Sequence, residues 1–436
     1  MHDRRINKLY SMKFNYSYYN IVLKEDDDFV YLYNSYSGAL CKLEKEIHNL
    51  ILNNVLDDND KCEYFDTLFA QGFIKPIDLN EYNKIVLTER TTVLTNQGGY
   101  ISYVIAPTLA CNLNCDYCFE GEYRTNKIIS DEKLIAVADY ILKRTSPDIK
   151  EIRVGWFGGE PLVAFNQIVK FSEYLLPKLK EKNINYYSSM ISNGVLLTKE
   201  RAKILAEKCS LKKVQLTIDG TKEIYCARKR ATAKQFDDLF ENVKAALEFL
   251  KISIRLNCDV NNYDNLKIVM EQLLTRCDNN KNLSVYLAKL VDYSGCGEEQ
   301  FLSQNEFDAK RIEFDKYVCG LQKKPYKPQI LKSRKSFCGL FKLRNLVIGP
   351  DGELYKCEHH VGQKDKVIGD IVYGLNYNDF LMKFIANEPL EKCKTCKIFP
   401  VCLGGCPAQK ADLPHGESCF YSEFYIKHLL ENYIAD

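Results

Sequence analysis

The residues with the clearest chemical potential are three cysteines in the stretch Cys111-Asn-Leu-Asn-Cys115-Asp-Tyr-Cys118, which follows an apolar run over residues 100–107. Three thiolates at Cys-x3-Cys-x2-Cys spacing on a loop can hold three irons of a four-iron four-sulfur cube. The fourth iron then has no protein ligand. A zinc loop is the alternative, but structural zinc sites use four closed ligands at shorter paired spacings.

This spacing, with the aromatic Tyr117 just before the last cysteine, resembles that of radical S-adenosylmethionine enzymes. The resemblance implies that the open iron chelates the amino and carboxylate groups of S-adenosylmethionine. An electron from the cluster then breaks a carbon-sulfur bond and releases a 5'-deoxyadenosyl radical. Cys111, Cys115 and Cys118 are therefore the expected cluster ligands, and Tyr117 is an expected cofactor contact.

A second cysteine array lies near the C-terminus, with the pattern Cys-x13-Gly-x4-Cys, a gap, Cys-x2-Cys-x5-Cys-x3-Cys, and a final cysteine. Its members are Cys338, Cys357, Cys393, Cys396, Cys402, Cys406 and Cys419. Seven ligands do not divide into complete zinc sites, although Cys393-x2-Cys396 alone would fit a zinc ribbon. Iron-sulfur clusters that carry electrons are therefore favoured.

The array resembles the SPASM extension, the auxiliary-cluster domain of peptide-maturing enzymes. The resemblance implies a distal cluster with four ligands, Cys393, Cys396, Cys402 and Cys419, and a nearer cluster with three, Cys338, Cys357 and Cys406. The chain is thus expected to hold three four-iron clusters.

The nearer cluster lacks a fourth cysteine, because residues 339–356 contain none. Either a distant residue such as Cys319 or Cys296 completes it, or one iron is open to a substrate thiolate. Glu358 directly follows Cys357. It is a candidate base for a substrate proton, or else a solvent-facing carboxylate.

The elements that must position these residues alternate between strand and helix. Apolar strand segments are predicted at 101–106, 152–157, 187–191, 213–218, 253–258 and 284–288. Helical periodicity is predicted at 131–143, 162–182, 199–208, 236–249 and 265–276. Such alternation implies parallel strands with right-handed crossovers. We therefore expect an α/β fold built on a partial (β/α)6 barrel.

In such barrels the active groups collect where strands end. The expected strand ends carry Gly158, Gly159 and Glu160, then Ser192 and Asn193, then Arg255 and Asn257. The glycines allow a close approach of backbone to a ligand, and Glu160 is suited to a cationic amine. The family resemblance implies contacts of the first group with the methionine amino group and of the others with the ribose and carboxylate. Each could equally be plain structure, since Asn193-Gly194 and Asp219-Gly220 are common turn dipeptides.

Domain boundaries follow from changes of pattern. Residues 1–76 show three short strands and two helices and resemble a winged-helix-like precursor-peptide recognition domain. Residues 41–75 hold four basic and seven acidic side chains, which argues against DNA. A purely structural cap stays open. Residues 77–99 are expected to be a linker, 100–322 the radical barrel, and 323–436 the auxiliary iron-sulfur domain, whose first 13 residues form a basic, solvated stretch.

The composition indicates which binding partners and which cellular compartment to expect. A formal charge of +2 gives no overall field for nucleic acid or an anionic membrane. The chain shows no signal peptide and no membrane-spanning run, and its 18 cysteines suit metal ligation in a reducing compartment. We expect a cytoplasmic enzyme that receives electrons from a flavodoxin- or ferredoxin-type donor.

Together these features predict an enzyme that matures a ribosomally made peptide, binding its leader in the N-terminal domain and forming a thioether from a substrate cysteine. Carbon-carbon or carbon-oxygen cross-linking is the nearest alternative. Anaerobic sulfatase maturation, which forms formylglycine, is a second, although that family generally lacks the first hundred residues. A non-catalytic electron relay and an RNA-modifying enzyme are less consistent with the sequence.

Overall fold

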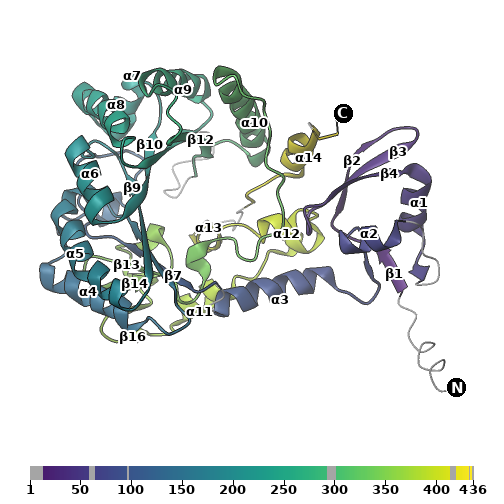
Figure 1. The fold of residues 1–436 in the computed structure, drawn as a ribbon, viewed down its shortest axis with the longest axis horizontal. Coiled ribbons are helices and arrows are strands. Elements are labelled where there is room, and N and C mark those ends of the chain that lie inside the picture. The colour runs from purple at the N-terminus through teal and green to yellow at the C-terminus, as the bar shows by residue number, and fades with distance from the viewer. Residues whose placement is uncertain are drawn as a thin grey trace.

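The computed structural model describes residues 13–57, 64–95, 98–291, 301–412, 419–431 and 433–434. Its largest element is a ten-stranded sheet, in which six parallel strands that are consecutive in the chain form the curved wall in Figure 1. These strands are β7 (Tyr100–Ile105), β8 (Glu151–Trp156), β9 (Asn185–Ser192), β10 (Leu211–Ile218), β11 (Lys251–Cys258) and β12 (Leu283–Lys289). They are neighbours in chain order, so the α/β fold with a partial barrel is confirmed.

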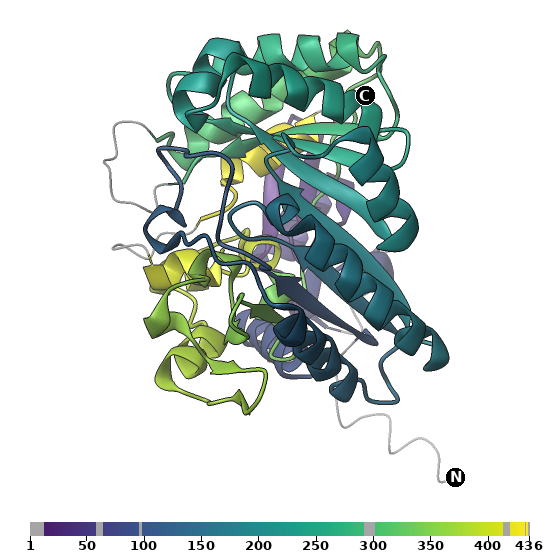
Figure 2. The ribbon, with the colours of Figure 1, turned by 90° about the vertical axis from the view of Figure 1, so that its left-hand side faces the viewer.

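Helices cover the outer side of this wall, as Figure 2 shows face on. They are α4 (Asp131–Lys143), α5 (Phe165–Glu181), α6 (Lys199–Lys208), α8 (Ala233–Ala246) and α9 (Tyr263–Arg276). Each turns a stripe of apolar residues to the sheet, such as Leu134, Val137 and Ile141 of α4. The short α7 (Lys222–Lys229) was not predicted, because its sequence is mostly polar.

The C-terminal region continues the barrel sheet instead of forming a separate one. Strand β13 (Leu346–Ile348) pairs parallel with β7, and β14 (Glu353–Tyr355), β15 (Gly369–Asp370) and β16 (Gly374–Leu375) follow antiparallel. The remaining helices are α10 (Gln304–Leu321), α11 (Asp379–Ala386), α12 (Phe399–Cys402), α13 (Pro407–Asp412) and α14 (Glu423–Glu431). In Figure 1, α12 to α14 lie between the barrel and the N-terminal region.

The N-terminal region contains two small antiparallel sheets. One is β2 (Asn20–Glu25), β3 (Phe29–Asn34) and β4 (Leu40–Glu44), which match the three predicted strands. The other has the order β5-β1-β6, from β5 (Leu56–Asp57), β1 (Lys13–Tyr16) and β6 (Ile74–Pro76), which are too short for periodicity to reveal. Helices α1 (Lys45–Asn53) and α2 (Phe65–Ala70) pack beside them.

Two segments differ from the expectation of solvated connections. The predicted linker 77–99 contains the helix α3 (Glu81–Leu94), which Asn80 caps by accepting a hydrogen bond from the amide of Asn83. Only Ile85 and Val93 are buried apolar residues of α3, so its pattern was too sparse to recognise. The basic stretch 323–335 keeps five of its six basic side chains exposed, as predicted, but it is also anchored, since its Leu331 carbonyl accepts a hydrogen bond of 2.6 Å from the hydroxyl of Tyr33.

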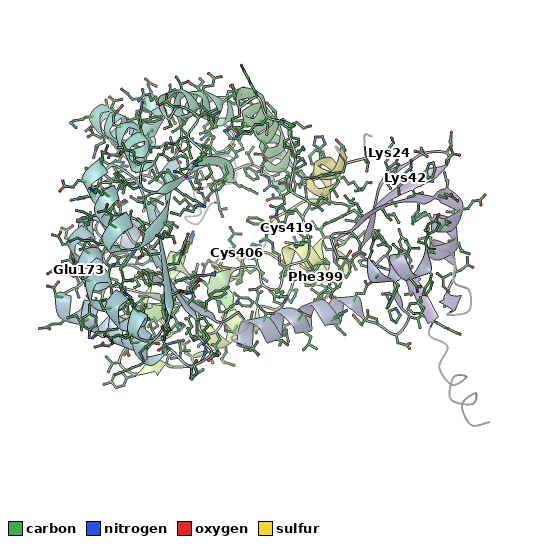
Figure 3. All side chains as sticks on the ribbon, in the orientation of Figure 1. Lys24, Lys42, Glu173, Phe399, Cys406 and Cys419 are labelled. Atoms are coloured by element: carbon green, nitrogen blue, oxygen red, sulfur yellow. The ribbon has the colours of Figure 1, made fainter. Side chains whose placement is uncertain are left out.

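The N-terminal region is docked on the distal cysteine segment. Lys397 donates from Nζ to the carbonyl oxygen of Asn20 (3.0 Å), and Ser35 donates from Oγ to the carbonyl of Lys397 (2.5 Å). Tyr82 of α3 packs on Phe399, which is labelled in Figure 3, with 5.0 Å between ring centroids. Within the described ranges, no helix is long and apolar enough to cross a membrane.

Candidate active site and cluster sites

The first cysteine group lies on the loop after β7. The pKa of Cys111 is raised to about 11, mainly by burial, with smaller contributions from Glu160 and the neighbouring thiol of Cys115. Burial also raises the pKa of Cys115, with a contribution from Cys118. The guanidinium of Arg124 faces all three thiols. A cation at this position favours the thiolate form that iron requires.

Helix α7 fixes the backbone of this loop. The amide of Asn114 donates to the carbonyl oxygen of Lys229 (3.3 Å), and the amide of Asp116 donates to that of Arg228 (3.1 Å). The loop therefore has a firm support at the carboxyl end of β10, although it is not itself helical or extended.

The two glycines after β8 are required by the cysteine loop. Gly158 has a φ of +118°, and a Cβ there would overlap the carbonyl oxygen of Thr108. A Cβ on Gly159 would lie 2.5 Å from the carbonyl oxygen of Ala110. The glycines thus allow a close backbone approach, as predicted, but the approach is between two loops of the protein. It holds the end of β8 against the cysteine loop.

Glu160 joins the ends of β8 and β9 through a fully buried carboxylate. It accepts hydrogen bonds from the amide of Leu162 (2.9 Å), the hydroxyl of Ser192 (2.9 Å) and the amide of Asn193 (2.7 Å). Asn193 in turn donates from Nδ2 to Oδ1 of Asn112 on the cysteine loop (2.8 Å). Burial raises the pKa of Glu160, and these donors oppose the shift.

Asp219, directly after β10, links three residues that were predicted to contact the cofactor: Tyr117, Asn257 and, through Asn257, Arg255. Its carboxylate accepts hydrogen bonds from the hydroxyl of Tyr117 and from Nδ2 of Asn257 (3.0 Å). Arg255 donates from Nε to Oδ1 of Asn257 (2.9 Å). Lys229 completes the network with an ion pair to Asp219 (3.2 Å), and both side chains are buried.

Glu358 lies where the auxiliary region meets the barrel. The carboxylate of Glu358 raises the pKa of the Cys338 and Cys357 thiols, and Arg255 of β11 faces this carboxylate. Burial raises the pKa of Glu358 and Arg255 opposes this. Glu120, two residues after Cys118, also faces Glu358. The base candidate is therefore near both the barrel loops and the nearer cysteine group.

Four residues of this site were not singled out as site residues from the sequence: Glu120, Arg124, Asp219 and Lys229. Asp219 was noticed only as part of a turn dipeptide, and its place after the fourth strand was the available signal. Glu120 and Arg124 follow the cysteine loop within six residues. Lys229 gave no signal, because it reaches the site from an unpredicted helix.

The C-terminal thiols fall into two groups that interact within themselves. In the distal group, burial raises the pKa of Cys393, and the nearby thiols of Cys396, Cys402 and Cys419 raise it as well. Figure 3 labels Cys419 in the middle of the molecule. Four mutually close thiols, one for each iron, fit a four-iron cluster.

In the near group, burial raises the pKa of Cys357 well above its usual value, and Cys406 and Cys338 raise it further. Cys319 on α10 is acted on by Asp315 and Lys324 and not by these thiols, so it is not placed to complete the group. The other candidate, Cys296, lies outside the described residues.

Neither C-terminal group has the geometry of a single-ion site. In the described part of the chain, no three Cys, His, Asp or Glu side chains converge as ligands of one metal ion. Each thiolate of a cube binds a different iron, so its thiols stand further apart than zinc ligands do. The two donor sets, with four and three thiols, have the number and type of ligands that iron-sulfur clusters use.

Comparisons with known proteins agree with this geometry. Residues 105–263 match the family model of the Radical SAM superfamily. A cysteine-type anaerobic sulfatase-maturating enzyme of Clostridium perfringens is 26% identical over 342 residues, which cover 70% of this chain and 88% of that enzyme. The radical SAM cyclopropyl synthase TigE of Paramaledivibacter caminithermalis is 24% identical over 218 residues, which cover 43% of this chain and 46% of TigE.

Two solved structures share the fold. Native anSMEcpe with bound AdoMet has a TM-score of 0.58 at 22% identity, covering 77% of this chain and 97% of its own. SuiB of Streptococcus suis, bound to its precursor peptide SuiA, has a TM-score of 0.53 at 15% identity, covering 94% and 99%. The chain therefore contains a region, residues 105–263, that matches the Radical SAM superfamily, and its fold is similar to those of anSMEcpe and SuiB. In sequence the chain is similar to anaerobic sulfatase-maturating enzymes, and in fold it is similar to SuiB over almost its whole length.

Proposed function

We propose that this protein is a radical SAM maturase that installs a thioether cross-link in a ribosomally synthesised precursor peptide. The observation that carries the proposal is the three-thiol group of Cys338, Cys357 and Cys406 beside Glu358 and Arg255 at the barrel's active edge. Three ligands leave one position of a near cluster for a substrate cysteine, which is the reason to favour sulfur as one partner of the bond.

We assign the cluster ligands as three sets, which together hold three four-iron clusters. The barrel set is Cys111, Cys115 and Cys118, the near set is Cys338, Cys357 and Cys406, and the distal set is Cys393, Cys396, Cys402 and Cys419. With S-adenosylmethionine bound, the barrel cluster supplies a 5'-deoxyadenosyl radical. A flavodoxin- or ferredoxin-type protein is the proposed electron donor.

The chain's own residues then have distinct tasks. Glu160 holds Ser192 and Asn193 against the cysteine loop, and this arrangement orients the cofactor's methionine end. Asp219 fixes Tyr117, and through Asn257 it fixes Arg255. Glu358 is placed to take a proton from the substrate at its carboxylate.

The N-terminal region is the proposed leader-binding domain. SuiB, whose structure holds a precursor peptide, aligns with 94% of this chain, whereas anSMEcpe aligns with 77%. Strand β4 is an edge of its three-stranded sheet, with β3 on one side only among the described strands. An extended leader peptide can add to such an edge by backbone hydrogen bonds.

The test uses reconstituted protein under anaerobic reduction, with S-adenosylmethionine and the short peptide encoded beside its gene. We expect 5'-deoxyadenosine, and a peptide that loses two daltons and one alkylatable thiol per cross-link by mass spectrometry. A Cys115→Ala variant should give neither product. Two-dalton loss with all thiols still alkylatable would instead indicate a carbon-carbon or carbon-oxygen link.

Sulfatase maturation is the second candidate, and the 26% identity to the C. perfringens enzyme favours it. It predicts that a sulfatase-derived peptide containing cysteine is converted to formylglycine without any leader. Formation of an aldehyde on that peptide, detected by hydrazide labelling, together with no change in the neighbouring precursor, would replace the thioether proposal.

A further inference from the structure

Lys410 of α13 lies between the two C-terminal cysteine groups. Its positive charge acts on Cys393 and Cys402 of the distal group and on Cys406 of the near group. Both the ammonium of Lys410 and the thiol of Cys393 lie beside Gly404. A Cβ placed on Gly404 would be 3.5 Å from Nζ of Lys410 and 3.7 Å from Sγ of Cys393. One ammonium group is therefore shared by the two sets of thiols.

The ammonium of Lys410 is buried, and it has no hydrogen-bond acceptor among the described residues. Its acidic neighbour is Glu89 of α3, a buried side chain of which one oxygen also lacks a partner in that part of the chain. Burial lowers the pKa of Lys410, whereas Glu89 and the three thiols raise it. An unpaired buried ammonium is costly, and the nearby charges of Glu89 and of the three thiols offset this cost.

A second lysine in the same segment provides a contrast. Lys394 directly follows Cys393, but its side chain is 52% exposed and pairs with Glu391 at 2.8 Å. Solvent screens an exposed charge of this kind. Closeness in sequence to a cluster ligand therefore does not give Lys394 the environment of Lys410.

We propose that Lys410 is a positioning residue whose charge raises the reduction potentials of both auxiliary clusters together. The inference rests on the cluster ligands assigned under the proposed function. The potential of an iron-sulfur cluster depends on its net charge, its hydrogen bonds and its exposure. A buried cation stabilises the reduced, more negative form of each cluster, so both become better electron acceptors.

The experiment is a potentiometric titration of the reconstituted full-length protein, followed by electron paramagnetic resonance. The variants are Lys410→Met, which keeps length without charge, Lys410→Arg, which keeps the charge, and the matched control Lys394→Met. Repeating the titrations in a Cys111→Ala, Cys115→Ala, Cys118→Ala background removes the barrel cluster, so that only the auxiliary signals remain.

We expect Lys410→Met to lower the reduction equilibrium constant of both auxiliary clusters about tenfold, which is about 59 mV for a one-electron couple. Lys410→Arg and Lys394→Met should keep the wild-type potentials. Unchanged potentials in Lys410→Met, or a shift of one cluster alone, would overturn the shared role and leave the ligand assignment standing. A wild-type protein without two auxiliary signals would overturn the assignment itself.

Iron analysis separates tuning from assembly. If Lys410→Met binds less iron, Lys410→Gln is titrated in its place. Loss of iron from both neutral variants, with full iron in Lys410→Arg, would show that the charge is needed to build the clusters, and it would overturn the redox role.

Discussion

Phe119, the residue after the last cysteine of the barrel loop, stacks on His359 with ring centroids 4.2 Å apart and 13° between the ring planes. His359 lies two residues after Cys357 of the near group. Phe157, directly after β8, also stacks on Phe119, with 6.3 Å between the ring centroids. Aromatic packing thus ties the loop expected to generate the radical to the segment expected to hold the substrate.

Replacing Phe119 with alanine should loosen this tie. We expect Phe119→Ala to cleave S-adenosylmethionine but to modify several-fold less peptide per 5'-deoxyadenosine formed, because a small misplacement of the substrate segment is enough to lose productive geometry. Phe119→Tyr, which keeps the ring, is the matched control. The measurement is the ratio of the two products, and an unchanged ratio in Phe119→Ala would show that the stack does not position the substrate.

Glu160→Gln should weaken the binding of S-adenosylmethionine. A glutamine offers one acceptor oxygen where the carboxylate offers two, so the amide of Asn193 or of Leu162 loses its partner in a buried site. An unpaired buried amide costs about 1–3 kcal/mol, and a loss of about 1.4 kcal/mol is tenfold in affinity. Isothermal titration of the reconstituted protein measures it.

Ser192→Ala is the comparison for that variant, since it leaves both amides bonded to Glu160. It removes the hydroxyl that donates to Glu160 and accepts from the amide of Gly194 (3.0 Å). We expect a smaller loss of affinity than in Glu160→Gln. Equal losses in the two variants, or none in Glu160→Gln, would mean that the carboxylate does not organise the cofactor site.

Asp219 and Lys229 form the buried ion pair of the site. Asp219→Ala leaves the lysine charge buried without its partner, which should lower the free energy of unfolding by about 3–5 kcal/mol. The double variant with Lys229→Met should be destabilised less than the sum of the single variants. Denaturant unfolding under anaerobic conditions measures these differences.

A surface pair of the same kind provides the control. Lys234 and Asp238 lie one helical turn apart on α8 at 2.7 Å, and the lysine is 81% exposed. Lys234→Met should therefore change the free energy of unfolding by less than about 0.5 kcal/mol. If Asp219→Ala were as mild as this control, the buried pair would not be a stabilising element.

Much of the fold could be predicted because one simple sequence pattern, an apolar strand followed by a polar loop, repeats along the barrel. The parallel strands carry a row of buried residues on the face under the helices, such as Ile152, Val154 and Trp156 of β8. The loops after the strands carry polar residues, as Glu160 and Asn193 show. The cysteine spacings predicted the loop and the C-terminal array, and the resemblance to the SPASM extension implied the division of that array into two groups. These features depend on residues that are close together in the sequence, so they can be predicted without knowledge of the fold.

The parts that escaped prediction depend on contacts between distant segments. Helix α3 is stabilised by burial of Glu89 and Val93 against the C-terminal region, and no local periodicity marks that contact. Lys229 and Lys410 are ordinary lysines in sequence, and only the fold places their charges beside thiols. Strand β13 is three residues long and becomes part of the barrel sheet only by pairing with β7.

Asp315 on α10 makes the stability of the fold depend on pH. Burial raises its pKa to about 6, and Arg311 opposes that shift only in part. The other ionisable groups acting around it are Cys319 on α10, Tyr326 in the following segment and Tyr425 on α14. None of them provides a second positive charge.

A carboxyl group whose pKa is raised on folding binds its proton more tightly in the native state. Its contribution is complete below the unfolded value of about 3.9 and is lost as the pH rises through about 6. Between pH 5 and pH 7 the wild type should lose about 1 kcal/mol of unfolding free energy from Asp315. Asp315→Asn, which cannot ionise, should lack this decline.

Thermal unfolding of the reconstituted protein at pH 5, 6 and 7 measures the difference between wild type and Asp315→Asn. Glu313→Gln is the control on the same helix, because Glu313 is 59% exposed and its charge is screened by solvent. The variant Asp315→Asn should gain stability relative to wild type as the pH rises, whereas Glu313→Gln should stay parallel to wild type. A gain at low pH instead would mean that Asp315 is ionised and stabilised in the folded protein, with Arg311 outweighing its burial.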